Sequence, residues 1–410
     1  MKRIYFILLF VFATLSLHSQ RILMDVDLPQ SSGGIDIPVS FNFKKWPFAP
    51  GASLVLYEKL GSEKFETPFQ ITQGDQYSLH WLIKPGEKEQ TKRKYELTTG
   101  VPTDLKTIVA DRNDQSLTIH AGNKNFLRYH HAVVYPPVGV DTVYRRSGFI
   151  HPLWSPHGQE LTRINPPDHY HHYGIWNPWT QVLFKNDTID FWNLGGKKGT
   201  VRFAKFISTT NGSVFSEFRA LHEHVVTRKN VDEEVIIREQ QIVRVYRPDE
   251  TQNYYIVDFT SELTCATEYP VTLLEYRYGG FAWRATEQWH KGNSEVLTSE
   301  EKTRSSADGT KARWFTVQGE VDNDYAGIVL MSNPTNYNHP EPLRIWPENQ
   351  NERGDVFVNF SPTKDKDWKL EPGKKYVLNY RLVVFNGPFT SEKADKAWSY
   401  YAQPPKIVSK

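Results

Sequence analysis

The sequence predicts an all-β protein in two parts, a small N-terminal immunoglobulin-like β-sandwich and a large antiparallel supersandwich. Two observations support this prediction. Apolar and polar residues alternate with a period of two in many segments, as expected for half-buried strands. Turn-forming clusters of Gly, Pro and Asn separate these segments. The clearest alternating segments are residues 53–57, 201–206, 235–245, 254–263 and 376–385.

A helical pattern is convincing only near the C-terminus, from Ser391 to Tyr401, where Ser391 is a suitable N-cap. A chain with many successive strands and one late helix favours packed antiparallel sheets over parallel α/β layers.

The chain divides into four segments. In residues 1–20, Lys2 and Arg3 precede an apolar run, and Ser19 provides a small residue near a cleavage point. This is a signal-peptide pattern, so we expect a secreted or periplasmic protein. Residues 21–110 are expected to form the N-terminal module, residues 111–402 the large domain and residues 403–410 a tail. The large domain has too many strands for one small sandwich and suits a galactose-mutarotase-like supersandwich.

Composition excludes several classes of protein. The net charge is +2, which provides no electrostatic basis for binding nucleic acid. A single cysteine excludes an internal disulfide framework. No apolar stretch after the N-terminal run is long enough to span a bilayer. The chain contains 12 Trp, 21 Tyr and 23 Phe. Strands favour aromatic residues, but this many tryptophans also suits proteins that bind the apolar faces of sugar rings.

The densest functional pattern lies between residues 145 and 179, which contain five of the 14 histidines, among them His151, His171 and His172. Long irregular segments inside a compact domain are usually functional or disordered, and the aromatic content here argues for order. Three interpretations of the segment from Asp168 to His172 remain open. Asp168, His169 and His171 suit a divalent metal, single histidines suit loop carbonyls, and the group as a whole suits acid–base catalysis. We predict neither a metal-ligand set nor a cofactor.

The runs SGFIHPLWSP (residues 147–156), LTR (161–163) and DHYHHYGIW (168–176) resemble a bacterial family labelled "methane oxygenase PmoA-like". The resemblance extends over about residues 120–390. A membrane copper oxygenase needs transmembrane helices, so the label does not describe the activity of this chain. The resemblance implies a mutarotase-like fold and a setting among secreted proteins of polysaccharide-utilisation loci.

A second candidate segment, residues 274–284, is predicted to be a strand that ends at Gly279 and Gly280. Glu275 is expected on one face of this strand and Tyr278 on the other. A cross-strand ion pair and core tyrosines are the structural alternative. In a third segment, residues 336–346, Arg344 is suited to bind a carboxylate or sulfate. Residues 218–224 form a further strand whose histidines we expect to be structural.

These residue types favour β-elimination over hydrolysis, because no opposed pair of carboxylates is evident. A base removes the C5 proton of a uronate, an arginine neutralises its carboxylate, and an acid protonates the leaving group. The predicted catalytic residues are His151, His171, His172, Tyr278 and Arg284. The predicted substrate-binding residues are Arg163, Trp176, Trp179, Glu275, His339 and Arg344.

The expected partner is an anionic oligosaccharide, and the enzyme is expected to be a dehydratase or a polysaccharide lyase. Two alternatives remain open. In a glycosidase or mutarotase-like epimerase, Glu275 would be the essential residue. In a glycan-binding protein without catalysis, the N-terminal module and the pair Trp176 and Trp179 would hold the sugar.

Overall fold

The computed structural model describes residues 21–29, 34–85, 91–228 and 231–410. Within these ranges the chain consists mostly of antiparallel strands, so the predicted all-β class is confirmed. The expected signal peptide falls on residues 1–20, which lie outside the described residues. None of the helices in the described ranges has the length and apolar character needed to cross a bilayer.

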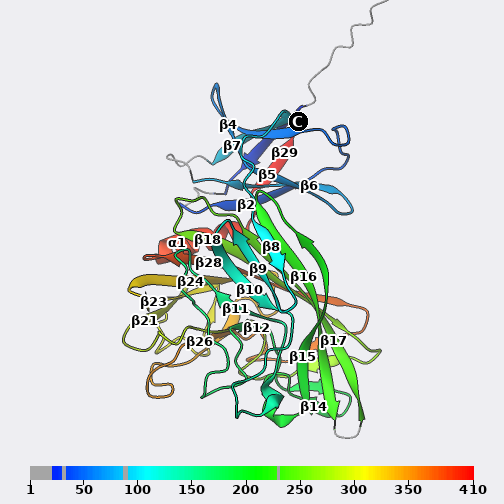
Figure 1. Cartoon of the computed structure of the whole chain (residues 1–410), viewed down its shortest axis with the longest axis vertical. Coiled ribbons are helices and arrows are strands. Elements are labelled where there is room, and N and C mark those ends of the chain that lie inside the picture. Colours follow the sequence, from blue (N-terminus) through cyan, green and yellow to red (C-terminus); the bar gives the residue numbers. More distant parts are fainter. Residues whose placement is uncertain (1–20, 30–33, 86–90, 229–230) are drawn as a thin grey trace, which may run out of the picture.

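The N-terminal module contains two antiparallel sheets (Figure 1). The first comprises, in spatial order, β29 (Lys406–Ser409), β1 (Arg21–Asp27), β7 (Lys92–Thr99), β3 (Leu54–Leu60) and β4 (Glu63–Glu66). The second comprises β2 (Ile37–Asn42), β6 (Tyr77–Ile83) and β5 (Phe69–Gln73). Alternate residues of both sheets meet in one core that includes Leu56, Trp81 and Tyr95.

The C-terminal residues correct the predicted domain organisation. Residues 403–410 were expected to be a tail, but β29 pairs with β1 in an antiparallel ladder from Met24–Ser409 to Asp27–Lys406. Ile407 packs against the core of the N-terminal module. Figure 1 accordingly shows β29, in red, among the blue N-terminal strands. The module is therefore built from both ends of the described chain.

Two large sheets form the second part of the molecule. The first comprises β22 (Lys311–Ala312), β25 (Glu341–Ile345), β26 (Phe357–Phe360), β20 (Ala282–Arg284), β12 (Ile175–Trp176), β11 (Phe149–Leu153), β10 (Lys124–His130), β9 (Ser116–Ala121) and β8 (Val109–Arg112). The second comprises β15 (Gly199–Thr210), β16 (Phe215–Arg228), β17 (Val231–Tyr246), β18 (Tyr254–Cys265), β28 (Lys375–Asn386), β24 (Asp324–Ser332), β23 (Trp314–Val321) and β21 (Ser294–Thr298). A smaller sheet comprises β14 (Asp187–Ile189), β13 (Val182–Phe184), β19 (Val271–Leu273) and β27 (Trp368–Leu370).

The two large sheets share one hydrophobic core, to which β12, β16 and β28 contribute Ile175, Phe218 and Leu382 respectively. Successive side chains of a strand point to opposite faces. Ile175 therefore faces this shared core, whereas Trp176 belongs to a separate cluster on the outer face of the first large sheet. This alternation places the candidate site on that outer face.

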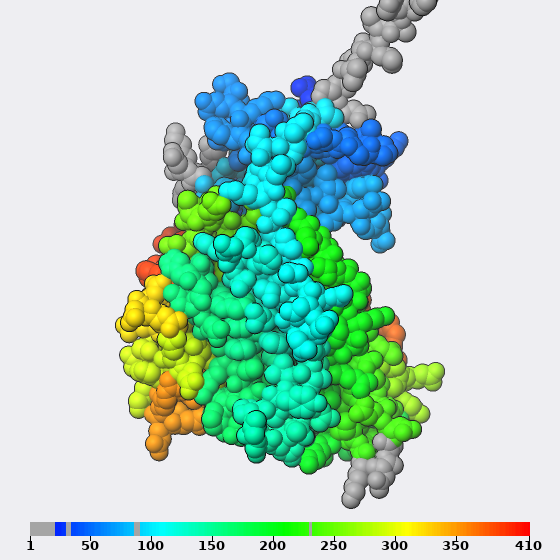
Figure 2. Space-filling view, viewed as in Figure 1, coloured from blue at the N-terminus to red at the C-terminus, as the bar shows by residue number. Residues whose placement is uncertain are grey.

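The helix α1 (Ser391–Ala402) lies where the two parts of the molecule meet (Figures 1 and 2). Ala394 and Ala397 pack with Leu82 of the N-terminal module and Trp314 of β23. The helix was predicted correctly, but its N-cap is Thr390, whose side chain accepts a hydrogen bond from the Lys393 backbone N–H. Two short 3₁₀ helices, η1 (Thr142–Tyr144) and η2 (Leu194–Gly196), lie in loops.

Candidate active site

An aromatic cluster covers the outer face of the first large sheet. Its buried members are Phe149, Tyr173, Trp176, Trp192, Leu194, Ala282, Trp346 and Phe357. Several of them project from β11, β12, β20 and β26, which are neighbours in the sheet. Large aromatic side chains on the face opposite the shared core need a second cover, because that face would otherwise be in water. The histidine-rich loop between β11 and β12 provides part of it.

The loop folds back on itself around the histidines. The backbone N–H of His169 donates to Pro166, and that of His172 donates to His169, so two turns follow each other. The Asn165 N–H donates to the His172 carbonyl. Gly174 closes the loop at φ +60°, and a Cβ there would lie 2.3 Å from the carbonyl oxygen of Ile150. Only glycine fits this approach without moving the backbone.

Three imidazoles from this loop meet above the aromatic cluster. The ring centroid of His169 lies 5.3 Å from that of His171 and 4.8 Å from that of His172. The ring of His169 also packs against Trp346 at 4.7 Å, and that of His172 packs against Phe357 at 5.1 Å. One ligand atom from each of the three histidines lies within 4.8 Å of the other two, so the group is suited to hold a metal ion.

Asp168 anchors the histidines to the sheet. One of its carboxylate oxygens accepts a hydrogen bond of 2.8 Å from His169 Nδ1 and a second from the side chain of Asn351. The buried guanidinium of Arg284 lies 3.0 Å from Asp168 and 2.9 Å from Asp355. Burial alone would raise the pKa of Asp168, but the His169 hydrogen bond and the charge of Arg284 hold it well below its usual range.

Burial keeps His171 and His172 neutral at physiological pH. Burial, reinforced by the neighbouring His169, lowers the pKa of His171 to about 4. Burial also lowers the pKa of His172 well below its usual range, and only 1 % of this residue is exposed. Neutral imidazoles retain a lone pair for a proton or a metal ion.

Tyr278 lies on the same face and shares neighbours with the histidines. Its hydroxyl oxygen accepts hydrogen bonds from Arg344 Nη2 at 3.0 Å and from Trp346 Nε1 at 3.1 Å. The exposed Arg277 lies with its guanidinium carbon 5.4 Å from the centre of the Tyr278 ring. Trp346 thus contacts Tyr278 through its N–H and His169 through its ring.

The structure brings six predicted residues together around Trp346 and its neighbours. They are His171, His172, Tyr278, Arg284, Trp176 and Arg344. Their sequence separation is large, and they meet because β12, β20 and β25 lie in one sheet. The strand predicted for residues 274–284 is wrong in part, because β20 covers only Ala282–Arg284 and residues 274–278 are irregular.

Two predicted residues lie beside this group with other partners. The His151 ring is bonded to Thr162 Oγ1 at 2.9 Å and stacks on His130. The Arg163 guanidinium pairs with Glu287 at 3.0 Å. Their side chains therefore support the surrounding loops in this structure.

The structure corrects the prediction that Trp176 and Trp179 stack on a sugar. Trp179 lies in the core between the two large sheets, and Trp176 lies beneath His172. The exposed fractions of the two residues are 0 % and 1 %. Neither indole presents a face to a ligand, because both were needed to fill apolar space between packed elements.

Glu275 and His339 do not join the group. Glu275 is exposed, and its backbone N–H bonds to Asp367. His339 bonds to Ser332 and stacks on Trp398 of α1. The Pro-rich segment that contains both His339 and Arg344 therefore supplies Arg344 and Trp346, but not His339, to this face of the sheet.

Sequence reasoning missed Trp346 and Asp355 as members of the site. Trp346 is the last residue of the segment 336–346 that was singled out for Arg344. Ile345 packs in the shared core, so its two neighbours, Arg344 and Trp346, point to the opposite face of the sheet. Asp355 lies in a loop before β26 and has no local signal. Its role follows only from its ion pair with Arg284, which is 71 residues away.

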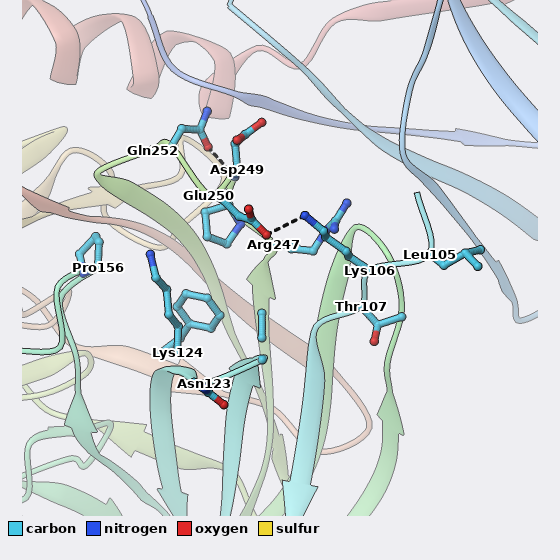
Figure 3. A pocket seen from close by; sticks show the side chains of 14 residues that line it. Leu105, Lys106, Thr107, Asn123, Lys124, Pro156, Arg247, Asp249, Glu250 and Gln252 are labelled. Carbon is cyan, nitrogen blue, oxygen red and sulfur yellow. Dashed lines mark hydrogen bonds and ion pairs between the residues drawn. The ribbon is translucent and has the colours of Figure 1, made fainter. Parts of the chain in front are cut away.

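A separate pocket of about 690 Å³ lies near the junction with the N-terminal module (Figure 3). Lys106, Lys124 and Arg247 line it together with Asp249 and Glu250. The Lys106 ammonium and the Glu250 carboxylate are 2.7 Å apart. None of the lining residues belongs to the histidine group, and the volume of the pocket alone does not identify a ligand.

Three solved structures resemble the chain at low similarity. An alpha-mannosidase from Enterococcus faecalis V583 has a TM-score of 0.40 and 8% identity, over 95% of this chain and 46% of its own. The heparan sulfate lyase HepC from Pedobacter heparinus has a TM-score of 0.31 and 10% identity, over 72% and 38%. A GalM/aldose epimerase homologue from C. elegans has a TM-score of 0.33 and 8% identity, over 70% and 100%.

At these TM-scores the three similarities carry no inference about the reaction. The chain spans about half the length of the mannosidase that it matches. No curated protein matches the chain in sequence. The comparisons also give no support to the PmoA-like label.

One family model matches the chain over residues 116–399, which includes the histidine-rich loop and all the strands that carry the candidate site. The matched region is more than half of the 410 residues. The model has no assigned activity. The chain therefore belongs to the family of unknown function DUF6807.

Proposed function

We propose that this chain is an exported carbohydrate-active enzyme that catalyses β-elimination on uronate-containing oligosaccharides, as a dehydratase or a lyase. The supporting observation is the hydrogen bonding of Tyr278. Its oxygen accepts two hydrogen bonds, from Arg344 and Trp346, and within the described residues its own O–H has no acceptor. A phenol held in this way keeps its proton free for a bound substrate.

Tyr278 is proposed as the acid of the elimination. The C5–H bond of the uronate breaks, its electron pair forms the C4–C5 double bond, and the C4–O bond breaks. Tyr278 gives its proton to the departing oxygen, and the histidine loop takes up the C5 proton. Such proton transfers contribute rate factors of about 10²–10⁴.

The charge around Tyr278 favours an anionic substrate. Arg277 and Arg344 lie over its ring, and behind Arg344 the carboxylate of Asp308 pairs with both Arg344 and Lys364. Three cations and one anion leave an excess of positive charge. Arg277 is exposed, and no ion pair with another described residue holds it.

The arginine assignment made from the sequence is therefore changed. Arg284 or Arg344 was predicted to hold the uronate carboxylate, but Asp168 and Asp355 already neutralise Arg284, and Arg344 pairs with Asp308 and donates to Tyr278. The two carboxylates already balance the charge of the Arg284 guanidinium, and only 1 % of its side chain is exposed, so it is poorly placed to take a third carboxylate. We propose Arg277 as the group that holds the carboxylate, with Arg344 positioning Tyr278.

The test is an ultraviolet assay of the purified full chain with a panel of uronate oligosaccharides, because the conjugated unsaturated uronate absorbs and the substrate does not. We expect absorbance to rise with the wild type and to stay constant with Tyr278→Phe, because this variant lacks the proposed acid. Tyr276→Phe is the matched control, because this neighbouring half-exposed tyrosine is replaced without touching the Arg344 hydrogen bond. New reducing ends without absorbance would show hydrolysis and refute elimination, and binding without any product would show a glycan-binding protein.

A further inference from the structure

We propose that His169, His171 and His172 form a binding site for one divalent late first-row transition-metal ion of the zinc class. Their ligand atoms lie within 4.8 Å of one another. A tetrahedral ion with Zn–N distances of about 2.0–2.1 Å places its nitrogen ligands roughly 3.3 Å apart. Small rotations of the three side chains therefore bring the nitrogens to coordinating distance.

The loop holds the three histidines in place before any ion binds. The turns at Pro166 and His169 fix the backbone, and the Asn165 side chain bonds to the Tyr170 carbonyl. Ile164 and Tyr173 form a β-bridge that closes the loop at its base. A preorganised group of ligands loses little conformational entropy when it binds an ion.

Asp168 selects the tautomer of His169. The His169 Nδ1–H donates to this carboxylate at 2.8 Å, so the lone pair of the ring is on Nε2. A carboxylate that holds the second nitrogen of a metal-bound histidine orients the ring and raises its basicity. Arg284 and Asn351 in turn fix the carboxylate, so that it supports the histidine and does not itself face the ion.

Two of the imidazoles have unused nitrogens. Only 1 % of His172 is exposed, and its Nδ1 is buried without a hydrogen-bond partner. The ring of His171 makes no hydrogen bond to any other described residue, and the aromatic rings that it packs against there are the two neighbouring imidazoles. Buried polar atoms without partners are costly, and an ion shared by the three rings removes this cost.

The ligand atoms define the class of ion. Imidazole nitrogen suits zinc, copper, iron, cobalt and nickel, whereas calcium and magnesium require oxygen ligands. Three histidines leave a fourth position for water, as in catalytic sites. A hydroxide in that position would accept the C5 proton and become water. This last role rests on the proposed function, whereas binding of the ion does not.

The experiment is calorimetric titration of the full chain with Zn²⁺ after chelator treatment and dialysis. We expect one ion per chain, no heat with Ca²⁺ or Mg²⁺, and at least a hundredfold weaker binding in His169→Ala and His171→Ala. His131→Ala is the matched control, because this histidine lies outside the group and bonds to the Asn113 carbonyl. Asp168→Asn should weaken binding by roughly 10–100-fold, as expected for a positioning residue.

Two results would overturn the metal site. One is the absence of stoichiometric Zn²⁺ uptake by the wild type. The other is unchanged affinity in both histidine variants. If a variant does not fold, judged by circular dichroism, X-ray absorption of the zinc-loaded wild type replaces it, and fewer than three imidazole ligands contradicts the proposal. No substrate enters these measurements, so their outcome is independent of the elimination assay.

Discussion

At the scale of single residues, the site depends on which polar groups are compensated and which are free. Arg284 and Arg277 are both near the aromatic cluster, but two carboxylates hold Arg284, whereas Arg277 is exposed. A buried cation whose charge two carboxylates already balance gains little from a third carboxylate. Around Tyr278, the groups available to a substrate are therefore the Tyr278 hydroxyl proton and the Arg277 guanidinium.

Replacing Arg277 should weaken substrate binding without removing the acid. In Arg277→Ala we expect KM for a uronate oligosaccharide to rise about fivefold, the equivalent of ~1 kcal/mol for an exposed ion pair. The value of kcat should change little, because Tyr278 keeps both hydrogen bonds. Steady-state kinetics measure both constants, and Arg277→Lys, which keeps the charge, is the control. An unchanged KM would exclude Arg277 as the carboxylate partner.

Glu341 provides a prediction for stability that is independent of the site. Burial raises the pKa of this carboxyl to about 7, although Ser332, Asn336 and Tyr380 donate hydrogen bonds to it. The pKa of Glu341 in the folded protein lies above its unfolded value of 4.5. The protonated carboxyl therefore contributes its full stabilisation below pH 4.5, and this stabilisation is lost as the pH rises through 7.

In the wild type, ionisation of Glu341 should lower the free energy of unfolding by up to ~3 kcal/mol between about pH 5 and 8. We expect this decrease to be absent from Glu341→Gln. Urea denaturation across this range measures it. Glu320→Gln, on an exposed position of β23, is the control. A variant that keeps the wild-type slope would show that Glu341 is ionised in the folded protein throughout.

At the scale of elements, the histidine loop depends on Gly174. Its φ of +60° and the 2.3 Å approach to the Ile150 carbonyl exclude a side chain. Gly174→Ala should lower the free energy of unfolding by at least ~2 kcal/mol, because left-handed strain adds to a backbone clash. Gly158→Ala is the matched control, since its φ is +95° with nothing within 4 Å of a new Cβ. Equal losses in the two variants, measured by urea denaturation, would contradict the close approach.

β29 should stabilise the N-terminal module. Removing residues 406–410 deletes the ladder with β1 and exposes the edge of the first sheet. We expect a thermal transition lowered by several degrees, since ~1 kcal/mol corresponds to about 2–8 °C depending on domain size. Val408→Ala is the control, because this exposed side chain leaves the ladder intact. A truncated chain with the wild-type transition would show that the strand adds no stability.

The sequence predicted elements well where the signal is local. The long strands β15, β17, β18 and β28 carry continuous alternation and appear where that alternation indicated them. The strands β12 and β20 have only two and three residues, and pairing with distant neighbours defines them. The high density of histidines between residues 145 and 179 indicated the loop between β11 and β12. The roles of Arg284 and Trp179 depended on partners and packing that no local pattern reveals.

At the scale of the whole molecule, buried histidines control the response to acid. Burial lowers the pKa of His80 and of His222 to about 4. His80 lies against Phe215, where the N-terminal module meets the large domain, and His222 lies between the two large sheets beside Tyr129. Both groups are neutral in the folded protein at pH 6, where the unfolded chain already binds protons.

The folded pKa of each histidine lies below its unfolded value of 6.5. The contribution of each neutral imidazole to the free energy of unfolding is therefore full above pH 6.5 and is lost as the pH falls toward 4. Glu341 acts in the opposite direction, but the histidines are more numerous. We expect urea midpoints to fall between pH 7 and 5, with a smaller fall in His80→Gln than in His131→Gln. Midpoints that rise on acidification would contradict this account.

The central claim is that the outer face of the first large sheet carries an elimination site around Tyr278 and Trp346. The most direct measurement is mass spectrometry of the products of a uronate oligosaccharide in water enriched in the heavy oxygen isotope. Elimination predicts an unsaturated uronate and no solvent oxygen in any product. A product that has gained one solvent oxygen at a new reducing end would show hydrolysis and contradict the claim.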